Sequence, residues 1–205
     1  MIITLDQINA MDRHERIRLI NSLSGPRTAY LLGTANNEGQ TNLAIFNSVM
    51  HIGANPPLLG FIMRPVVVER HSYENIVDQK YFSLNLVTED IIDKAHCTAG
   101  KFKRYESEFD ACALTPQYTE GFQAPFVKEA NIQLAMQCVE ILPIKSNNTK
   151  LIVSQIQFIQ LGSSILEQDG HINHDTANTV SVAGLESYYS NKLIRRFPFK
   201  ASKKD

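Results

Sequence analysis

Residues suited to binding an anion are concentrated between positions 64 and 72. They are Arg64, Arg70, His71 and Ser72. Guanidinium groups, a hydroxyl and the free N–H groups at the start of a helix bind phosphate, and Ser72 lies where a helix is predicted to begin. The same spacing also fits a surface loop in which the arginines form salt bridges with Glu69 and Glu74. The residues alone leave both interpretations open.

No other sequence motif specifies a reaction. The chain contains no G-x-G-x-x-G, no P-loop and no G-x-S-x-G nucleophile elbow, so no Rossmann or Walker nucleotide site is indicated. His171, His174 and Asp175 could ligate a metal, but Gly170 and Asn173 are typical of a turn, and we expect no metal here.

The cysteines, Cys97, Cys112 and Cys138, are odd in number and include no C-x-x-C pair. We therefore expect neither a disulfide framework nor a zinc ribbon. Cys97 beside His96 is interpreted as a buried structural cysteine, because adjacent helical residues do not face each other. Met1–Ala10 lacks the basic and apolar regions of a signal peptide, so a reducing cytoplasm is the expected location.

A long uncharged segment precedes the candidate anion site. No Asp, Glu, Lys or Arg occurs between Glu38 and Arg64. A spanning helix is not expected, because asparagine, serine and histidine are scattered through the segment and Pro56-Pro57 would break it. The segment Thr41–Met63 instead predicts two strands and their connection, buried or lining a pocket.

Composition is that of an ordinary soluble globular protein. The chain has 205 residues, of which 43% are hydrophobic and 20% charged, enough for one large domain with a buried core. The formal net charge of −1 gives no general affinity for nucleic acid. Residues 192–205 form a basic tail, which is either solvated or a handle for an anionic partner. Its cations are Lys192, Arg195, Arg196, Lys200, Lys203 and Lys204.

The hydrophobic pattern predicts strands with helices inserted between them. Apolar residues at helical spacing predict an amphipathic helix at about residues 5–23, ended by Gly25-Pro26. Strands are predicted at 28–35, 41–49, 58–63, 81–87, 132–139 and 151–161. Further helices are predicted at 69–79 and, capped by Thr88, from residue 89, with an irregular or short helical stretch at 101–116. This order favours a closed or partly closed antiparallel β-barrel in a single domain, residues 1–205.

Seven segments, in order, resemble the flavin reductase-like FMN-binding split-barrel family. They are PRTAYLLGT (26–34), GQTNLAIFNSV (39–49), NPPLLGF (55–61), ERHSYENI (69–76), FSLNLVTED (82–90), SEFDACALT (107–115) and QLAMQCVEI (133–141). The resemblance covers about residues 20–160. It implies an antiparallel, Greek-key split β-barrel, mainly β with inserted helices.

When the family's phosphate-binding turn is matched to this sequence residue by residue, it corresponds to Arg70-His71-Ser72. Arg70 stands for a lysine and Ser72 for a threonine, so a cation and a hydroxyl are retained, while His71 replaces an aspartate. Asn42-Leu43-Ala44 matches the family directly. The resemblance implies that the following strand holds the edge of the flavin ring through backbone groups. The cofactor-binding residues predicted in this way are Phe46, Asn47, Ser48, Val49, Met63, Arg64, Arg70 and Ser72.

An uncharged wall suits a flat, neutral aromatic ring, which needs apolar contacts and a few polar groups at its edge. The resemblance implies bound FMN, NAD(P)H as electron donor and a homodimer with the flavin near the subunit interface. The predicted activity is a flavin reductase that passes electrons to a free flavin, oxygen or a partner protein. We name no catalytic residue; His51 and His174 are the imidazoles worth testing as proton donors.

Two alternatives remain open. One is an electron-transfer flavoprotein resembling flavoredoxin, which binds FMN but oxidises NAD(P)H poorly. The other is a non-enzymatic barrel for a small ligand, in which the loop at 64–72 is only structural.

Overall fold

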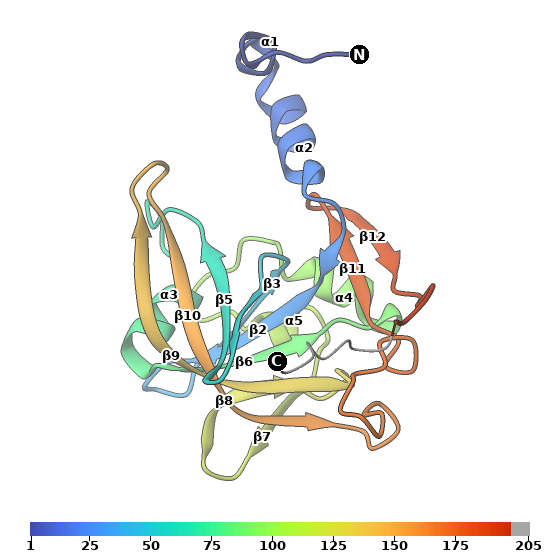
Figure 1. The fold of residues 1–205 in the computed structure, drawn as a ribbon. Coiled ribbons are helices and arrows are strands. Elements are labelled where there is room, and N and C mark those ends of the chain that lie inside the picture. Colours follow the sequence, from blue (N-terminus) through green and yellow to red (C-terminus); the bar gives the residue numbers. More distant parts are fainter. Residues whose placement is uncertain (198–205) are drawn as a thin grey trace, which may run out of the picture.

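Antiparallel strands make up most of the computed structural model, which describes residues 1–197 (Figure 1). The strands are β1 (Arg27–Thr28), β2 (Tyr30–Ala35), β3 (Thr41–Phe46), β4 (Met50–Ala54), β5 (Pro57–Met63), β6 (Tyr81–Leu86), β7 (Pro116–Thr119), β8 (Phe122–Val127), β9 (Ile132–Ile144), β10 (Thr149–Leu161), β11 (Val180–Ala183) and β12 (Ser187–Ser190). The α-helices are α1 (Leu5–Ala10), α2 (Arg13–Leu23), α3 (His71–Gln79), α4 (Ile92–Cys97) and α5 (Glu108–Ala111), and a 3₁₀ turn at Glu89–Ile91 precedes α4.

The largest sheet has seven strands in the order β3-β2-β6-β9-β10-β5-β4. All its neighbouring strands are antiparallel. A second sheet, β1-β11-β12, and the β7-β8 hairpin complete the β structure. The β9-β10 pair carries register shifts at Val153/Ser154 and Ile156/Phe158, where bulges bend and twist the strands. The predicted fold class, an antiparallel split barrel with inserted helices, is confirmed.

β8 lies directly over β2 and β6, and Gly33 is what permits this close approach. A Cβ atom built on Gly33 would lie 2.3 Å from the Pro125 carbonyl oxygen and 2.6 Å from Ser83 Oγ. Ser83 Oγ in turn donates a hydrogen bond to the Pro125 carbonyl at 2.5 Å. A larger side chain at position 33 would force these strands apart.

The core consists of two main apolar clusters. One cluster contains Leu32, Phe61, Phe82, Met136 and Ile152, all at most 1% exposed. The other contains Leu31, Leu43, Val87, Phe109 and Val180. Because adjacent residues of a strand point to opposite faces, Leu31 and Leu32 of β2 contribute to different clusters, and β2 is buried on both sides.

The uncharged segment forms three strands where the sequence predicted two. β3 ends at Phe46, earlier than predicted, and Asn47–Val49 connect it to β4, which the sequence analysis missed. β4 is an edge strand paired only with β5, and most of it is exposed. Of the two predicted environments, buried or lining a pocket, burial does not hold for this strand.

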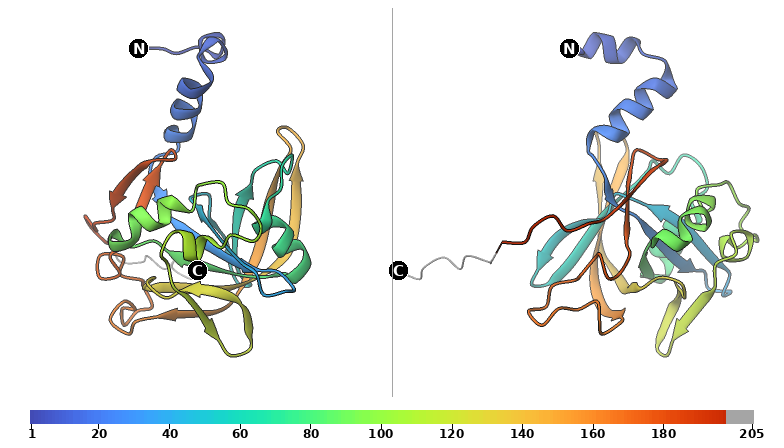
Figure 2. Two further views of the ribbon diagram at one scale, coloured as in Figure 1. Left: turned by 180° about the vertical axis from the view of Figure 1, so that it is seen from behind. Right: turned by 90° about the vertical axis from the view of Figure 1, so that its right-hand side faces the viewer.

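The predicted N-terminal helix is two helices that project from the barrel (Figures 1 and 2). Thr4 forms a capping box with Gln7 at the start of α1, and the Asp12 side chain accepts a hydrogen bond from the His14 N–H at 2.8 Å. Asp12 thus starts a new helix within the predicted one. Gly25, with a φ of +71°, follows the end of α2 in the conformation that glycine adopts most readily. No residue of either helix is buried.

Candidate functional site

The connection Asn47–Val49 is attached to the end of β5 through Ser48. Ser48 Oγ donates to the Ile62 carbonyl at 3.3 Å and accepts the Ile62 N–H at 3.1 Å. Residues far apart within the uncharged segment therefore lie side by side. Phe46, just before the connection, packs edge-on against Phe61, with ring centroids 5.2 Å apart. Met63 is 3% exposed and belongs to the same apolar cluster as Phe61.

Asn47 links this connection to the smaller sheet. Its side-chain nitrogen donates to the carbonyl oxygen of Gly184 at 3.0 Å, in the β11-β12 turn. Gly184 also lines a cleft of about 420 Å³ between that turn and α2, across which Arg18 and Glu186 form an exposed ion pair. The N-terminal arm and the predicted ring-edge residue are thus connected through one turn.

Arg64, directly after β5, and Arg70, directly before α3, are close enough for their charges to interact. Arg70 Nε donates to the Pro65 carbonyl at 2.9 Å, which orients the guanidinium. Burial lowers the pKa of Arg70, and the positive charge of Arg64 lowers it further. An arginine remains charged despite such shifts, so two mutually repelling cations are held in one place.

Neither arginine forms an ion pair within residues 1–197, although Glu69 and Glu74 lie close to Arg70 in the sequence. Glu69 is 3.8 Å from His71, and Glu74 pairs with Arg104. Glu74 reaches Arg70 only through a backbone contact, accepting the Arg70 N–H at 3.3 Å. The salt-bridged loop considered from the sequence is therefore not the arrangement adopted.

Ser72 lies in the first turn of α3, where Arg70 is the capping residue and contributes no side-chain cap. Ser72 is 7% exposed, and its Oγ accepts a hydrogen bond from Asn42 Nδ2 at 2.8 Å. The hydroxyl proton and the first-turn N–H groups of a nine-residue helix remain the local donors. Asn42, which belongs to the Asn42-Leu43-Ala44 match with the family, thus holds the Ser72 side chain of the predicted phosphate turn through this hydrogen bond.

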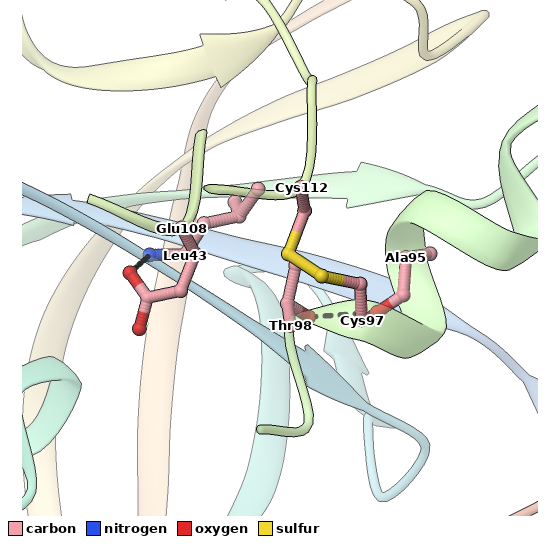
Figure 3. Close-up of a disulfide and its surroundings, with 6 residues drawn as sticks. All are labelled: Leu43, Ala95, Cys97, Thr98, Glu108 and Cys112. Carbon is pink, nitrogen blue, oxygen red and sulfur yellow. Dashed lines mark hydrogen bonds between the residues drawn. A yellow bond between two sulfur atoms is a disulfide. The ribbon is translucent and has the colours of Figure 1, made fainter. Parts of the chain in front are cut away.

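A buried carboxylate, which the sequence analysis did not identify, supports β3 from the other side. Glu108 is 6% exposed, and its Oε2 accepts the Leu43 N–H at 2.9 Å (Figure 3). Burial raises the pKa of Glu108, while that hydrogen bond and the nearby His71 oppose the rise. Beside it, Ser107 and Thr41 hydroxyls are hydrogen-bonded at 2.7 Å. The only sequence signal was the position of Glu108 within SEFDACALT.

Cys97 and Cys112 form a disulfide, with Cα atoms 5.7 Å apart (Figure 3). The expectation of no disulfide was wrong, because folding brings together two cysteines separated by 15 positions. Cys97 is also exposed rather than buried, whereas Cys112 is 5% exposed. Cys138 remains a free, buried thiol whose pKa is raised by burial.

The imidazoles named from the sequence lie apart from this cluster. His51 is exposed on edge strand β4. His174 Nδ1 is 3.0 Å from Thr179 Oγ1, and burial together with the charge of His171 lowers its pKa despite Asp175. Among residues 1–197 no group of three or more His, Cys, Asp or Glu side chains is arranged to hold a metal.

The basic tail is only partly within the described chain. Arg196 contacts Glu167 at 2.6 Å and Asp169 at 2.5 Å, while Lys192 and Arg195 are exposed. Lys200, Lys203 and Lys204 lie outside the described residues. In the part of the chain that the structure describes, no helix is long and apolar enough to cross a membrane.

The predicted site residues therefore occupy one region. Ser48 lies beside Ile62, Met63 ends β5 and Arg64 follows it, and Arg70 and Ser72 lie at the N-cap and in the first turn of α3. Val66, Val67 and Val68, between the two arginines, are exposed at 39%, 84% and 61%. Phe46 and Val49 pack against the core cluster that contains Met63, and the adjoining loop carries two arginines that form no ion pair within residues 1–197 and leads into α3.

Comparison with known proteins defines the class. The family model of the flavin reductase like domain matches residues 23–177. A structure from Shewanella frigidimarina NCIMB 400, provisionally assigned as a flavin reductase with a split barrel domain, is 38% identical, with a TM-score of 0.94 over 98% of this chain and 100% of that one. The chain belongs to the flavin reductase-like family.

More distant proteins share the fold. Nitrilotriacetate monooxygenase component B from Bacillus cereus is 22% identical, with a TM-score of 0.82 over 97% of this chain and 98% of that one. The flavoredoxin of Desulfovibrio vulgaris (Miyazaki F) is 19% identical, with a TM-score of 0.75 over 86% and 93%. In sequence alone, an uncharacterized protein from Aquifex aeolicus is similar, with 24% identity over 173 residues, which are 83% of this chain and 87% of that protein.

Proposed function

We propose that this protein binds FMN and acts as an NAD(P)H-dependent flavin reductase, passing electrons to a free flavin, oxygen or a partner protein. The observation that carries the proposal is a pair of neighbouring arginines, Arg64 after β5 and Arg70 at the N-cap of α3, which form no ion pair within residues 1–197 and follow the uncharged segment. The two positive charges repel each other, and an anion bound between them would offset that repulsion. When bound, FMN supplies the hydride-accepting chemistry.

The chain's own residues bind and orient the cofactor. Arg70, Arg64, Ser72 and the N–H groups of α3 hold the phosphate, because charge-assisted hydrogen bonds are the strong ones. Phe46 and Val49, which are only partly buried, supply the apolar wall, and Met63 lies buried in the core cluster against which they pack. The backbone and side chains of Asn47 and Ser48 meet the polar edge of the ring. Asn47 and Ser48 are themselves held by Gly184 and Ile62, which restricts the orientation of that edge.

The second subunit of a homodimer covers the open side of the site. Support comes from the N-terminal arm, in which Leu5, Ile20 and Leu23 are 70%, 46% and 70% exposed and nothing is buried. Helices as short as α1 are marginal without tertiary packing. The exposed valines of the loop at 64–70 need cover as well. Sedimentation at micromolar concentration should report a dimer; a strict monomer would contradict this assembly.

Flavoredoxin-like electron transfer is the second candidate, favoured by the structural similarity to the Desulfovibrio vulgaris protein. In that case FMN is bound but a partner protein, rather than NAD(P)H, reduces it. We infer a cytoplasmic location for both functions, because pyridine nucleotides and soluble redox partners are available there. Neither involves nucleic acid or a membrane.

Visible spectroscopy of the purified protein tests the proposal. FMN binding should give flavin absorption bands with one FMN per chain, and NADH or NADPH should bleach them under anaerobic conditions. Bands that persist with both nucleotides would indicate the electron carrier. A colourless protein that also fails to take up added FMN would refute flavin binding and favour a barrel for another small ligand.

A further inference from the structure

The Cys97–Cys112 disulfide closes a loop that reaches the candidate phosphate site. The loop runs from the end of α4 through exposed, charged residues to α5, which ends one residue before Cys112. Cys97 is exposed, so a thiol reductant can reach this side of the bond. In a reducing compartment such disulfides are rare and are usually redox-sensing or catalytic.

The closed loop holds the first turn of α3 through Arg104. Arg104 forms an ion pair with Glu74, and the other carboxylate oxygen of Glu74 accepts the Arg70 N–H. Glu74 therefore positions the backbone of Arg70, the cation assigned to the FMN phosphate. Both Arg104 and Glu74 are partly shielded, with side-chain exposures of 39% and 36%.

The same loop also supports β3. Ser107 and Glu108 contact the strand at Thr41 and at the Leu43 N–H. Between these two positions, Asn42 donates to Ser72 Oγ. The loop thus acts on both parts of the phosphate turn, on Arg70 through Glu74 and on Ser72 through β3.

We propose that the Cys97–Cys112 pair is a redox-modification site that sets FMN affinity, with the disulfide form binding FMN more tightly. The inference rests on the proposed FMN site. The expected reductant is a dithiol of the thioredoxin class. Its thiolate attacks Sγ of Cys97, the S–S bond breaks, and Cys112 leaves as a thiolate that takes a proton. The second thiol of the reductant then releases Cys97 as a thiol, so the reductant is oxidised to a disulfide as the pair gains two electrons.

Reduction breaks the covalent bond between the two ends of the loop, Cys97 and Cys112. The positions of Arg104 and Glu108 within the loop are then less restricted. We expect FMN affinity to fall about fivefold or more, within the usual range of coupling between two sites. Reciprocity requires FMN to make the disulfide harder to reduce by the same factor. For a two-electron couple, each tenfold change corresponds to a shift of about 30 mV in reduction potential.

FMN titration by fluorescence tests the proposal on the full-length protein. The protein is compared oxidised, after reduction with dithiothreitol and anaerobic desalting, and as the Cys97→Ser/Cys112→Ser variant. Cys138→Ser is the matched control, because it removes a cysteine but keeps the disulfide. Thiol alkylation and mass spectrometry verify the redox state, and thermal melts verify that each form is folded.

Arg104→Met should reduce the difference between oxidised and reduced protein, because it removes the route through Glu74, whereas the neighbouring Lys103→Met should preserve the full difference. Equal FMN dissociation constants for folded oxidised and reduced protein would overturn the redox site and leave the proposed function standing. Resistance of the folded protein to dithiothreitol would also overturn it. Failure of every form to bind FMN would overturn the proposed function together with this inference.

Discussion

Replacing Arg70 by alanine should weaken FMN binding about 10- to 150-fold. Arg70 is held by its Nε hydrogen bond to the Pro65 carbonyl, which leaves its terminal nitrogens to meet a phosphate. A hydrogen bond to a charged group is worth about 1.5–3 kcal/mol, and 1.4 kcal/mol corresponds to a factor of ten. Ser72→Ala should cost less, about 1 kcal/mol, because a neutral hydroxyl bond is lost while the helix N–H groups remain.

The informative assay is a parallel titration with FMN and riboflavin, which lacks the phosphate. Riboflavin should bind the wild type and Arg70→Ala with nearly equal affinity, since the ring contacts come from other residues. Arg195→Ala is a suitable control, because it removes an exposed arginine from the basic tail. Equal losses for FMN and riboflavin would indicate a damaged fold, and no loss for either would refute a phosphate role for Arg70.

Two further predictions concern stability. Ser48→Ala removes both hydrogen bonds to Ile62 and should lower stability by about 1–2 kcal/mol, or Tm by about 2–8 °C in a melt. Ser163→Ala, at an exposed position, should leave Tm unchanged, and an equal Tm for both variants would contradict the role of Ser48. Because burial raises the pKa of Glu108 above the usual 4.5, the folded state holds that proton more tightly than the unfolded chain. Its contribution to stability is therefore present at low pH and is lost as pH rises through the raised pKa. Glu108→Gln should flatten this part of the Tm–pH curve, and an unchanged slope would show that Glu108 is not its cause.

Hydrophobic pattern and turn residues determined most of the central strands. Alternating apolar residues locate β9, and segments rich in apolar residues locate β2, β6 and β10, because side chains in strands point to alternate faces or are buried on both. The short strands β4, β7, β8, β11 and β12 carry weaker patterns, and β4 is exposed at an edge. Their positions depend on pairing with strands that are distant in the sequence.

The candidate site could be assembled from the sequence only as far as the order of its segments. The types and spacing of Arg64, Arg70 and Ser72, together with the resemblance to the family, predict a phosphate turn, which stays a prediction. Proximity in the sequence could not show which acid pairs with which cation. Glu74 forms its ion pair with Arg104 and not with nearby Arg70, whose side chain forms no ion pair within residues 1–197.

Tertiary structure alone decided the contacts between distant residues. Asn47 and Gly184 are separated by 137 positions, Leu43 and Glu108 by 65, and the disulfide joins cysteines that form no sequence motif. Local propensity and periodicity act over one helix or strand, so they specify elements and the faces that must be buried. Partners of individual polar groups follow from strand order and packing, which bring each donor within reach of one acceptor among many.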